Sequence, residues 1–195
     1  GENMPSKVDK KGQSQRILMS AVNFISQHGY ANVSLRDIAQ DAGVVLSQLN
    51  YYFKNKEGLF VEVVKAVIKK YLVEIEELLQ RGSTAKERVN NLISYFSSTL
   101  KDNPKTFRLL FDLSNMAMWS ATFRDLLNSL FDDLARLIEK HVLPLCDKDS
   151  RLQSYSPNAI ARMLFGAMFG VSIQTLLNNE EEQLPEAMAA IGAIL

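Results

Sequence analysis

The sequence has a single cysteine, Cys146, and only two histidines among its 195 residues. One cysteine cannot form an intramolecular disulfide, and its isolation fits a reducing compartment. Two histidines far apart in the chain, with one cysteine, argue against a His/Cys metal site. We therefore predict no bound metal and no cofactor.

Catalytic motifs are also missing. The sequence contains no G-x-S-x-G, no Walker loop, no HExxH, no CxxC and no dinucleotide glycine fingerprint. It has no charged-then-apolar N-terminal signal, and no apolar run approaches the roughly 20 residues of a membrane span. These absences predict a cytoplasmic protein that is not an enzyme and does not bind a membrane.

Glycine and proline are scarce, at nine and five residues. Few helix breakers, with abundant alanine, leucine, lysine, glutamate and glutamine, favour an all-α fold. The apolar periodicity predicts helices over 14–28, 55–80, 84–100, 104–113, 120–142, 156–178 and 184–195, with Asn55 and Asn103 as N-caps. Residues 1–12 are polar and without periodicity, so we expect a disordered tail there.

Charge is unevenly distributed, although the net charge is zero. Residues 1–70 carry ten Lys/Arg and six Asp/Glu, an excess of four positive charges, and residues 71–195 carry the opposite excess. A basic head on an acidic body is expected of a DNA-binding domain joined to a regulatory one.

The stretch LRDIAQDAGVVLSQLNYYF, residues 35–53, predicts two short helices joined by a tight turn. A helix-turn-helix needs a small residue where the helices cross, a turn residue that tolerates positive φ, and an apolar residue on the second helix. Ala39, Gly43 and Leu49 supply these in order. The spacing is moderately specific, and an ordinary helical hairpin is the alternative.

The flanking residues make the pattern more specific. RILMSAVNFISQHGYANVSLRDIAQDAGV, followed by L-x2-YF and KNKEGLF, resembles the DNA-binding domain of TetR-family transcriptional repressors over about a third of the chain. The resemblance implies a three-helix head, a linker helix, a helical ligand-binding body and a homodimer on palindromic DNA. The predicted division is a tail at 1–12, a DNA-binding domain at 13–58 with the linker helix from about 56, and a body at 59–195.

The chain departs from the family at two positions of the second helix. Val45 replaces the usual capping serine or threonine and cannot cap, so we expect either a looser start of the helix or capping by Ser47 one turn later. Asn50 replaces a phosphate-contacting tyrosine, and its amide can donate to a phosphate or pair with adenine. The full set of predicted DNA-binding residues is Ser34, Arg36, Val45, Leu46, Ser47, Gln48, Asn50, Tyr51, Tyr52, Lys54 and Lys56.

The body is rich in aromatic residues and methionine, which line adaptable pockets for apolar ligands but also fill ordinary cores. We expect a helix junction at 114–119 to form the pocket mouth, as the resemblance implies. The predicted ligand-binding residues are Phe96, Phe111, Asn115, Met116, Trp119, Phe123, Met163 and Phe169.

The last two predicted helices, 157–178 and 184–195, mix glycine and alanine with large apolar residues. Glycine inside a helix costs about 0.5–1 kcal/mol relative to alanine, so its repeated use suggests close helix approach. A homodimer interface through both helices is the favoured interpretation, and close packing within one subunit is the alternative.

The predicted function is that of a ligand-responsive, sequence-specific DNA-binding regulator that acts as a repressor. It would act as a homodimer on double-stranded DNA and be released by a small apolar or amphipathic effector. The competing prediction is an all-α dimeric sensor or carrier with weakened DNA binding, given Val45 and Asn50.

Overall fold

The computed structural model of the chain describes residues 7–178 and 184–193. These residues form nine α-helices, three short 3₁₀ turns and no strand, which confirms the predicted all-α fold. The helices are α1 (Lys7–His28), α2 (Leu35–Ala42), α3 (Leu46–Phe53), α4 (Lys56–Leu79), α5 (Ala85–Asp102), α6 (Pro104–Ala117), α7 (Ala121–His141), α8 (Pro157–Asn178) and α9 (Leu184–Ala193).

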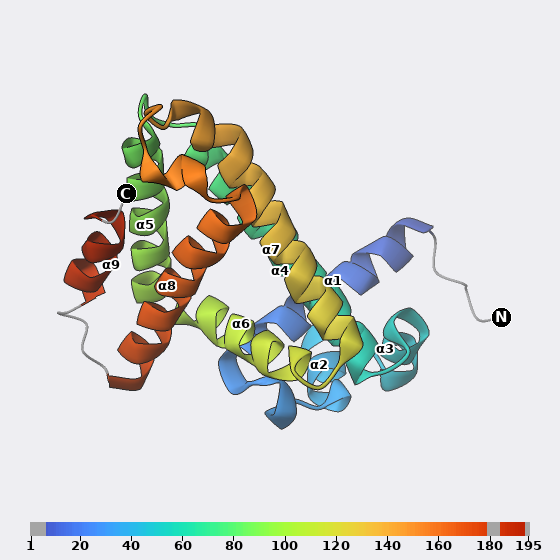
Figure 1. Cartoon of the computed structure of the whole chain (residues 1–195). Coiled ribbons are helices and arrows are strands. Elements are labelled where there is room, and N and C mark those ends of the chain that lie inside the picture. The colour runs from blue at the N-terminus through green and yellow to red at the C-terminus, as the bar shows by residue number, and fades with distance from the viewer. Residues whose placement is uncertain (1–6, 179–183, 194–195) are drawn as a thin grey trace.

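Two apolar cores hold the helices together. The N-terminal core joins α1, α2 and α3 to the first half of α4, and it also takes Leu109, Leu113 and Phe123 from α6 and α7. The body core joins the second half of α4 to α5, α6, α7, α8 and α9. In Figure 1, α4 and α7 run together from the N-terminal domain into the body. Because α4 belongs to both cores, a movement of this helix affects both parts of the molecule.

Local side-chain chemistry starts and stops the short N-terminal helices. The Ser34 hydroxyl accepts a hydrogen bond from the Asp37 amide, and the Asp37 carboxylate accepts one from the Ser34 amide, which closes a capping box at the start of α2. Gly43 ends α2 at φ 68°, a left-handed conformation that favours glycine. The Asn55 side chain accepts from the Gly58 amide at 2.7 Å, so Asn55 is the N-cap of α4 as predicted.

Two predicted helix boundaries are wrong, and one predicted cap lacks its side-chain hydrogen bond. Helix α1 begins at Lys7 instead of Ser14, so residues 7–12, predicted as disordered, are helical, while 1–6 lie outside the described residues. Helix α6 runs to Ala117 instead of Leu113, so the expected junction at 114–119 is mostly helix. The Asn103 side chain makes no capping hydrogen bond, because its backbone lies at φ −141° and ψ 67° and Pro104 occupies the first turn.

Helix α8 is more apolar than the sequence analysis expected. By length and composition alone it could cross a membrane, with a mean hydropathy of 1.5 over its best window, of which 33% is buried. Core helices pass the same test, and Leu164 and Met168 of α8 are fully packed in the body core. The apolar character of α8 therefore serves the body core in part and leaves a second apolar face outside it.

Candidate functional site

Helices α2 and α3 form the predicted two-helix motif at one end of the molecule (Figure 1). Leu49 of α3 is fully buried in the N-terminal core together with Ile38 and Ala39 of α2. The Val44 amide donates to the Ala39 carbonyl at 3.0 Å, which closes the turn behind Gly43. The small residue, the turn glycine and the apolar lock therefore occupy the positions that the helix-turn-helix requires.

The opposite face of α3 points to solvent. Tyr51 is 73% exposed and Val45 is 61% exposed, and Ser47 and Asn50 are also exposed. Around this face lie exposed Ser34, Arg36 and Lys54, while Leu46, Gln48, Tyr52 and Lys56 are half-buried. The structure thus brings the predicted DNA-binding residues to one end of the protein, on α2, α3 and the start of α4.

The start of α3 is held by Gln48. The Val45 side chain has no polar atom, and the Gln48 Oε1 instead accepts from the Val45 amide at 3.2 Å. This is half of a capping box, in which the third helical residue reaches back to the residue before the helix. The expected substitute, Ser47, does not take this role, and Gln48 is drawn away from the outer face.

Two other predicted contact residues have partners inside the domain. The Tyr52 hydroxyl donates to the Gln13 Oε1 on α1 at 3.1 Å. The Lys56 Nζ lies 4.4 Å from the centre of the Tyr30 ring, a cation–π arrangement at the start of α4. Both side chains therefore position helices against each other as well as bordering the exposed face.

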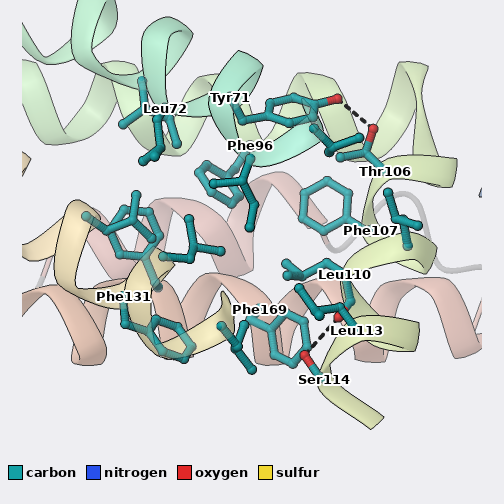
Figure 2. Close-up of a pocket in the computed structure, with 18 of the residues that line it drawn as sticks. Tyr71, Leu72, Phe96, Thr106, Phe107, Leu110, Leu113, Ser114, Phe131 and Phe169 are labelled. Atoms are coloured by element: carbon teal, nitrogen blue, oxygen red, sulfur yellow. Dashed lines mark hydrogen bonds between the residues drawn. The ribbon is translucent and has the colours of Figure 1, made fainter. Parts of the chain in front are cut away.

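The body contains a cavity of about 300 Å³ between α4, α5, α6, α7 and α8 (Figure 2). Its wall is almost wholly apolar, and the polar lining groups are hydroxyls of Tyr71, Tyr95, Thr99, Thr106 and Ser114, together with the Arg162 guanidinium. Tyr71 and Thr106 bond to each other at 2.6 Å, and the Ser114 hydroxyl donates to the Leu110 carbonyl at 2.8 Å. The volume stands at the lower end of the range for ligand pockets.

Two predicted pocket residues, Phe96 and Phe169, line this cavity. Phe111 stands behind the lining, with its ring 4.8 Å from that of Phe169. The largest contributions from outside the prediction come from α4 and α6, with six residues each, and those of α4 are Val64, Val67, Ile68, Tyr71, Leu72 and Ile75. The apolar periodicity of this helix was visible in the sequence, but the sequence did not show which cavity it would face.

The other five predicted pocket residues do not line this cavity. Trp119 is 86% exposed, and Asn115 and Met163 also face solvent. Met116 and Phe123 belong to the N-terminal core, where the Phe123 ring lies 5.2 Å from that of Phe60. For Met116 the reason lies in α6: because the helix continues to Ala117, its last turn joins the N-terminal core.

The ionisable groups along the cavity wall differ between its two sides. On α5, burial and the neighbouring Glu74 carboxylate raise the pKa of Tyr95, and its hydroxyl donates to Glu74. On α8, the Arg162 guanidinium lies 5.3 Å from the Phe131 ring centre, and its Nε donates to the Asn158 Oδ1 at 2.6 Å. Tyr95 therefore stays a neutral donor at physiological pH, and Arg162 supplies the positive charge of the cavity wall.

Helix α6 links the cavity to the N-terminal domain. On its far side Asp112 accepts a hydrogen bond from the Tyr30 amide at 2.9 Å. The Tyr30 ring packs 4.7 Å from the Phe60 ring of α4. The contact between α6 and Tyr30 therefore connects the cavity wall to the helix-turn-helix domain, in addition to α4 itself and to Leu109 and Leu113, which lie in both the cavity wall and the N-terminal core.

The second helix of the helix-turn-helix is exposed. One long helix joins this motif to an all-helical body that encloses an apolar cavity. Together these features define a helix-turn-helix transcriptional regulator. Residues 17–63 match the model of the tetR family of bacterial regulatory proteins. The N-terminal domain of the chain is therefore a TetR-type DNA-binding domain.

The chain is similar to the fatty acid metabolism regulator protein of Bacillus subtilis, with 32% identity over 91 residues, about half of either chain (47% of each). It is 21% identical over 175 residues to the regulator PksA of the same organism, covering 90% of this chain and 84% of PksA. A putative transcriptional regulator from Saccharomonospora viridis, solved in complex with choline, shares the fold at a TM-score of 0.77 and 20% identity, covering 94% of this chain and 95% of the other.

Proposed function

We propose that the chain is a cytoplasmic repressor that binds a palindromic operator as a homodimer and is released by a small, mainly apolar effector. The observation that carries the proposal is the double role of α4. Its first half packs in the N-terminal core through Leu59, Phe60 and Val63, and its second half forms one wall of the cavity. A molecule in the cavity therefore contacts the helix that positions α3.

On DNA, α3 would enter the major groove with Val45, Leu46, Ser47, Asn50 and Tyr51 toward the bases. A bidentate contact of Gln48 with adenine needs both atoms of its amide. Since the Gln48 Oε1 accepts from the Val45 amide, that contact would require the start of α3 to open. The exposed side chains Ser34, Arg36 and Lys54 are the proposed phosphate contacts, with Tyr52 and Lys56 at the border.

For the dimer we propose α8 as the principal interface helix. A side chain added at Gly166 or Gly170 would meet nothing within 4 Å, and Met163 and Leu177 of the same helix are exposed. Gly192 of α9 differs, because a Cβ there would lie 2.7 Å from the Asn90 Oδ1 on α5. Close packing within the subunit thus accounts for Gly192, and the open glycines of α8 are available to a second copy.

Release follows from a difference in binding energy between two arrangements of α4. The two recognition helices of a dimer must sit about 34–36 Å apart to reach successive turns of the groove. An effector that fits the cavity better when α4 has rotated away from the DNA-binding arrangement depopulates that arrangement. Val64 is in the N-terminal core and in the cavity wall alike, so it would transmit this rotation directly.

The cavity chemistry favours an effector with an apolar chain and one anionic group near Arg162. The name of the Bacillus subtilis relative supports including fatty acids in the first screen. Dodecanoic acid, dodecanol and dodecylamine are suitable probes, since they differ only in the head group. An effector at 100 times its Kd adds about 2.7 kcal/mol of stability, which raises the Tm of a chain of this size by roughly 5–11 °C.

A variant with a filled cavity tests the site. Leu110→Trp should abolish the Tm shift, because Leu110 lines the cavity, and should keep DNA binding. Met118→Ala is the matched control, because Met118 is exposed outside the cavity and should leave the shift unchanged. A shift that survives Leu110→Trp would place the effector elsewhere.

DNA binding is tested by incubating the purified protein with sheared genomic DNA of its source organism and sequencing the retained fragments. Enrichment of a palindromic sequence is expected, together with its release by the effector. The second candidate function is a dimeric sensor or carrier with weakened DNA binding, suggested by Val45 and Asn50. Effector binding without any enriched fragment would favour it.

A further inference from the structure

The first two turns of α1 extend beyond the helix-turn-helix core. Helix α1 has 22 residues, and its N-terminal part projects past the body on the side where α3 lies (Figure 1). Two contacts attach this projection to α3. The Gln13 Oε1 accepts from the Tyr52 hydroxyl at 3.1 Å, and the Lys10 Nζ lies 5.9 Å from the centre of the Tyr51 ring.

This projection is basic and borders the exposed face of α3. The segment Lys7–Gln13 contains three lysines and one aspartate. Lys10 touches the same Tyr51 that is 73% exposed on α3, so the positive charge is continuous with the proposed DNA-binding face. Phosphates of a duplex lie on both sides of the groove that a recognition helix enters, and lysine is a common partner for them.

We infer that the start of α1 is a second, helical arm of the DNA interface, in which Lys10 binds a backbone phosphate beside the groove that α3 enters. The inference rests on the proposed DNA binding of this chain. The arm is attached by the bond between Gln13 and Tyr52, which engages the one amide side chain of its first two turns. It contributes affinity and not sequence preference.

The salt dependence of binding measures such a contact. Each phosphate neutralised by a lysine adds about −0.9 to the slope of log K against log salt concentration. Both subunits of the proposed homodimer carry Lys10, so Lys10→Gln should make the slope shallower by about 1.8 per bound dimer. The affinity lost between 50 and 200 mM salt then becomes about 12-fold smaller. The wild type and the variant are compared on a 30-base-pair duplex of mixed sequence, because non-specific binding rests almost wholly on phosphate contacts.

Two further variants separate a helical arm from a flexible tail. Gly12 is exposed, and a side chain there meets nothing within 4 Å. Gly12→Pro breaks the helix before residue 12 and leaves proline at the first position of a shortened α1, where it is tolerated. It keeps every lysine in the chain. If the arm is helical, Gly12→Pro should make the slope of log K against log salt concentration as much shallower as Lys10→Gln does. Lys86→Gln is the control for loss of charge alone, because Lys86 is an exposed lysine at the start of α5.

The outcomes are distinct. A slope that is shallower by about 1.8 in both Lys10→Gln and Gly12→Pro, and unchanged in Lys86→Gln, supports the arm. An unchanged slope in Lys10→Gln overturns it while the wild type still binds DNA. An unchanged slope in Gly12→Pro with a shallower one in Lys10→Gln overturns the helical form of the arm. If the wild type binds neither this duplex nor any genomic fragment, the proposed function itself fails.

Discussion

Val45→Thr should stabilise the protein by completing the capping box of α3. The Gln48 side chain already accepts from the amide of residue 45, and a threonine hydroxyl there would accept from an amide of the first turn in return. Val45 is 61% exposed, so replacing a methyl group with a hydroxyl removes little buried apolar surface. The two side chains have nearly the same shape, and the backbone at residue 45 is extended as a cap requires (φ −80°, ψ 151°).

The expected gain is in the lower half of the range for N-caps. Capping residues contribute about 0.5–2 kcal/mol relative to alanine. The Gln48 backbone amide already donates to the Val45 carbonyl at 3.0 Å. The new hydroxyl therefore adds less than it would at an amide without any hydrogen-bond partner. We expect about 0.5–1 kcal/mol, which corresponds to a Tm increase of roughly 1–4 °C for a chain of this size.

Thermal and urea unfolding measure this gain. Val73→Thr on α4 is the matched control, because Val73 is 54% exposed and lies inside a helix, where a hydroxyl has no cap to form. Its stability should change by less than about 0.5 kcal/mol. Equal Tm values for the two threonine variants would refute the reasoning, since they would mean that the first turn of α3 has no unsatisfied amide for the hydroxyl.

Three other changes test the contacts between elements. Asp112→Ala removes the acceptor of the Tyr30 amide and should cost about 1–2 kcal/mol in thermal unfolding, whereas Asp112→Asn keeps an acceptor and should cost less. Hydrogen bonds from His141 and Lys140 lower the pKa of Glu76. Its contribution to stability is therefore present above about pH 4.3 and is lost as the pH falls. Glu76→Gln should lower the urea midpoint at pH 7 and match the wild type near pH 3. Leu177→Glu places a charge on the exposed face of α8 and should shift a dimer to monomers in analytical ultracentrifugation, and an unchanged dimer would move the interface off this face.

The features that the sequence alone determined depend on interactions between residues close together in the chain. The capping box of Ser34, the left-handed turn at Gly43 and the cap at Asn55 each depend on residues within four positions. Local interactions of this kind leave the same pattern in every chain that forms them. The all-α fold, the helix-turn-helix and the family were therefore predictable from the order of the residues alone.

Only the tertiary structure decided the position of the cavity, because its wall comes from five helices whose relative rotation no local pattern encodes. The continuation of α6 to Ala117 turned Met116 toward the N-terminal core and left Trp119 in solvent. The same kind of long-range packing attached the start of α1 to Tyr52 of α3, which made a helix of residues that lack apolar periodicity. The tertiary structure also showed that Gly192 is packed within the subunit, whereas Gly166 faces open space. The sequence could not distinguish the two positions, because glycine has no side chain whose polarity indicates its surroundings.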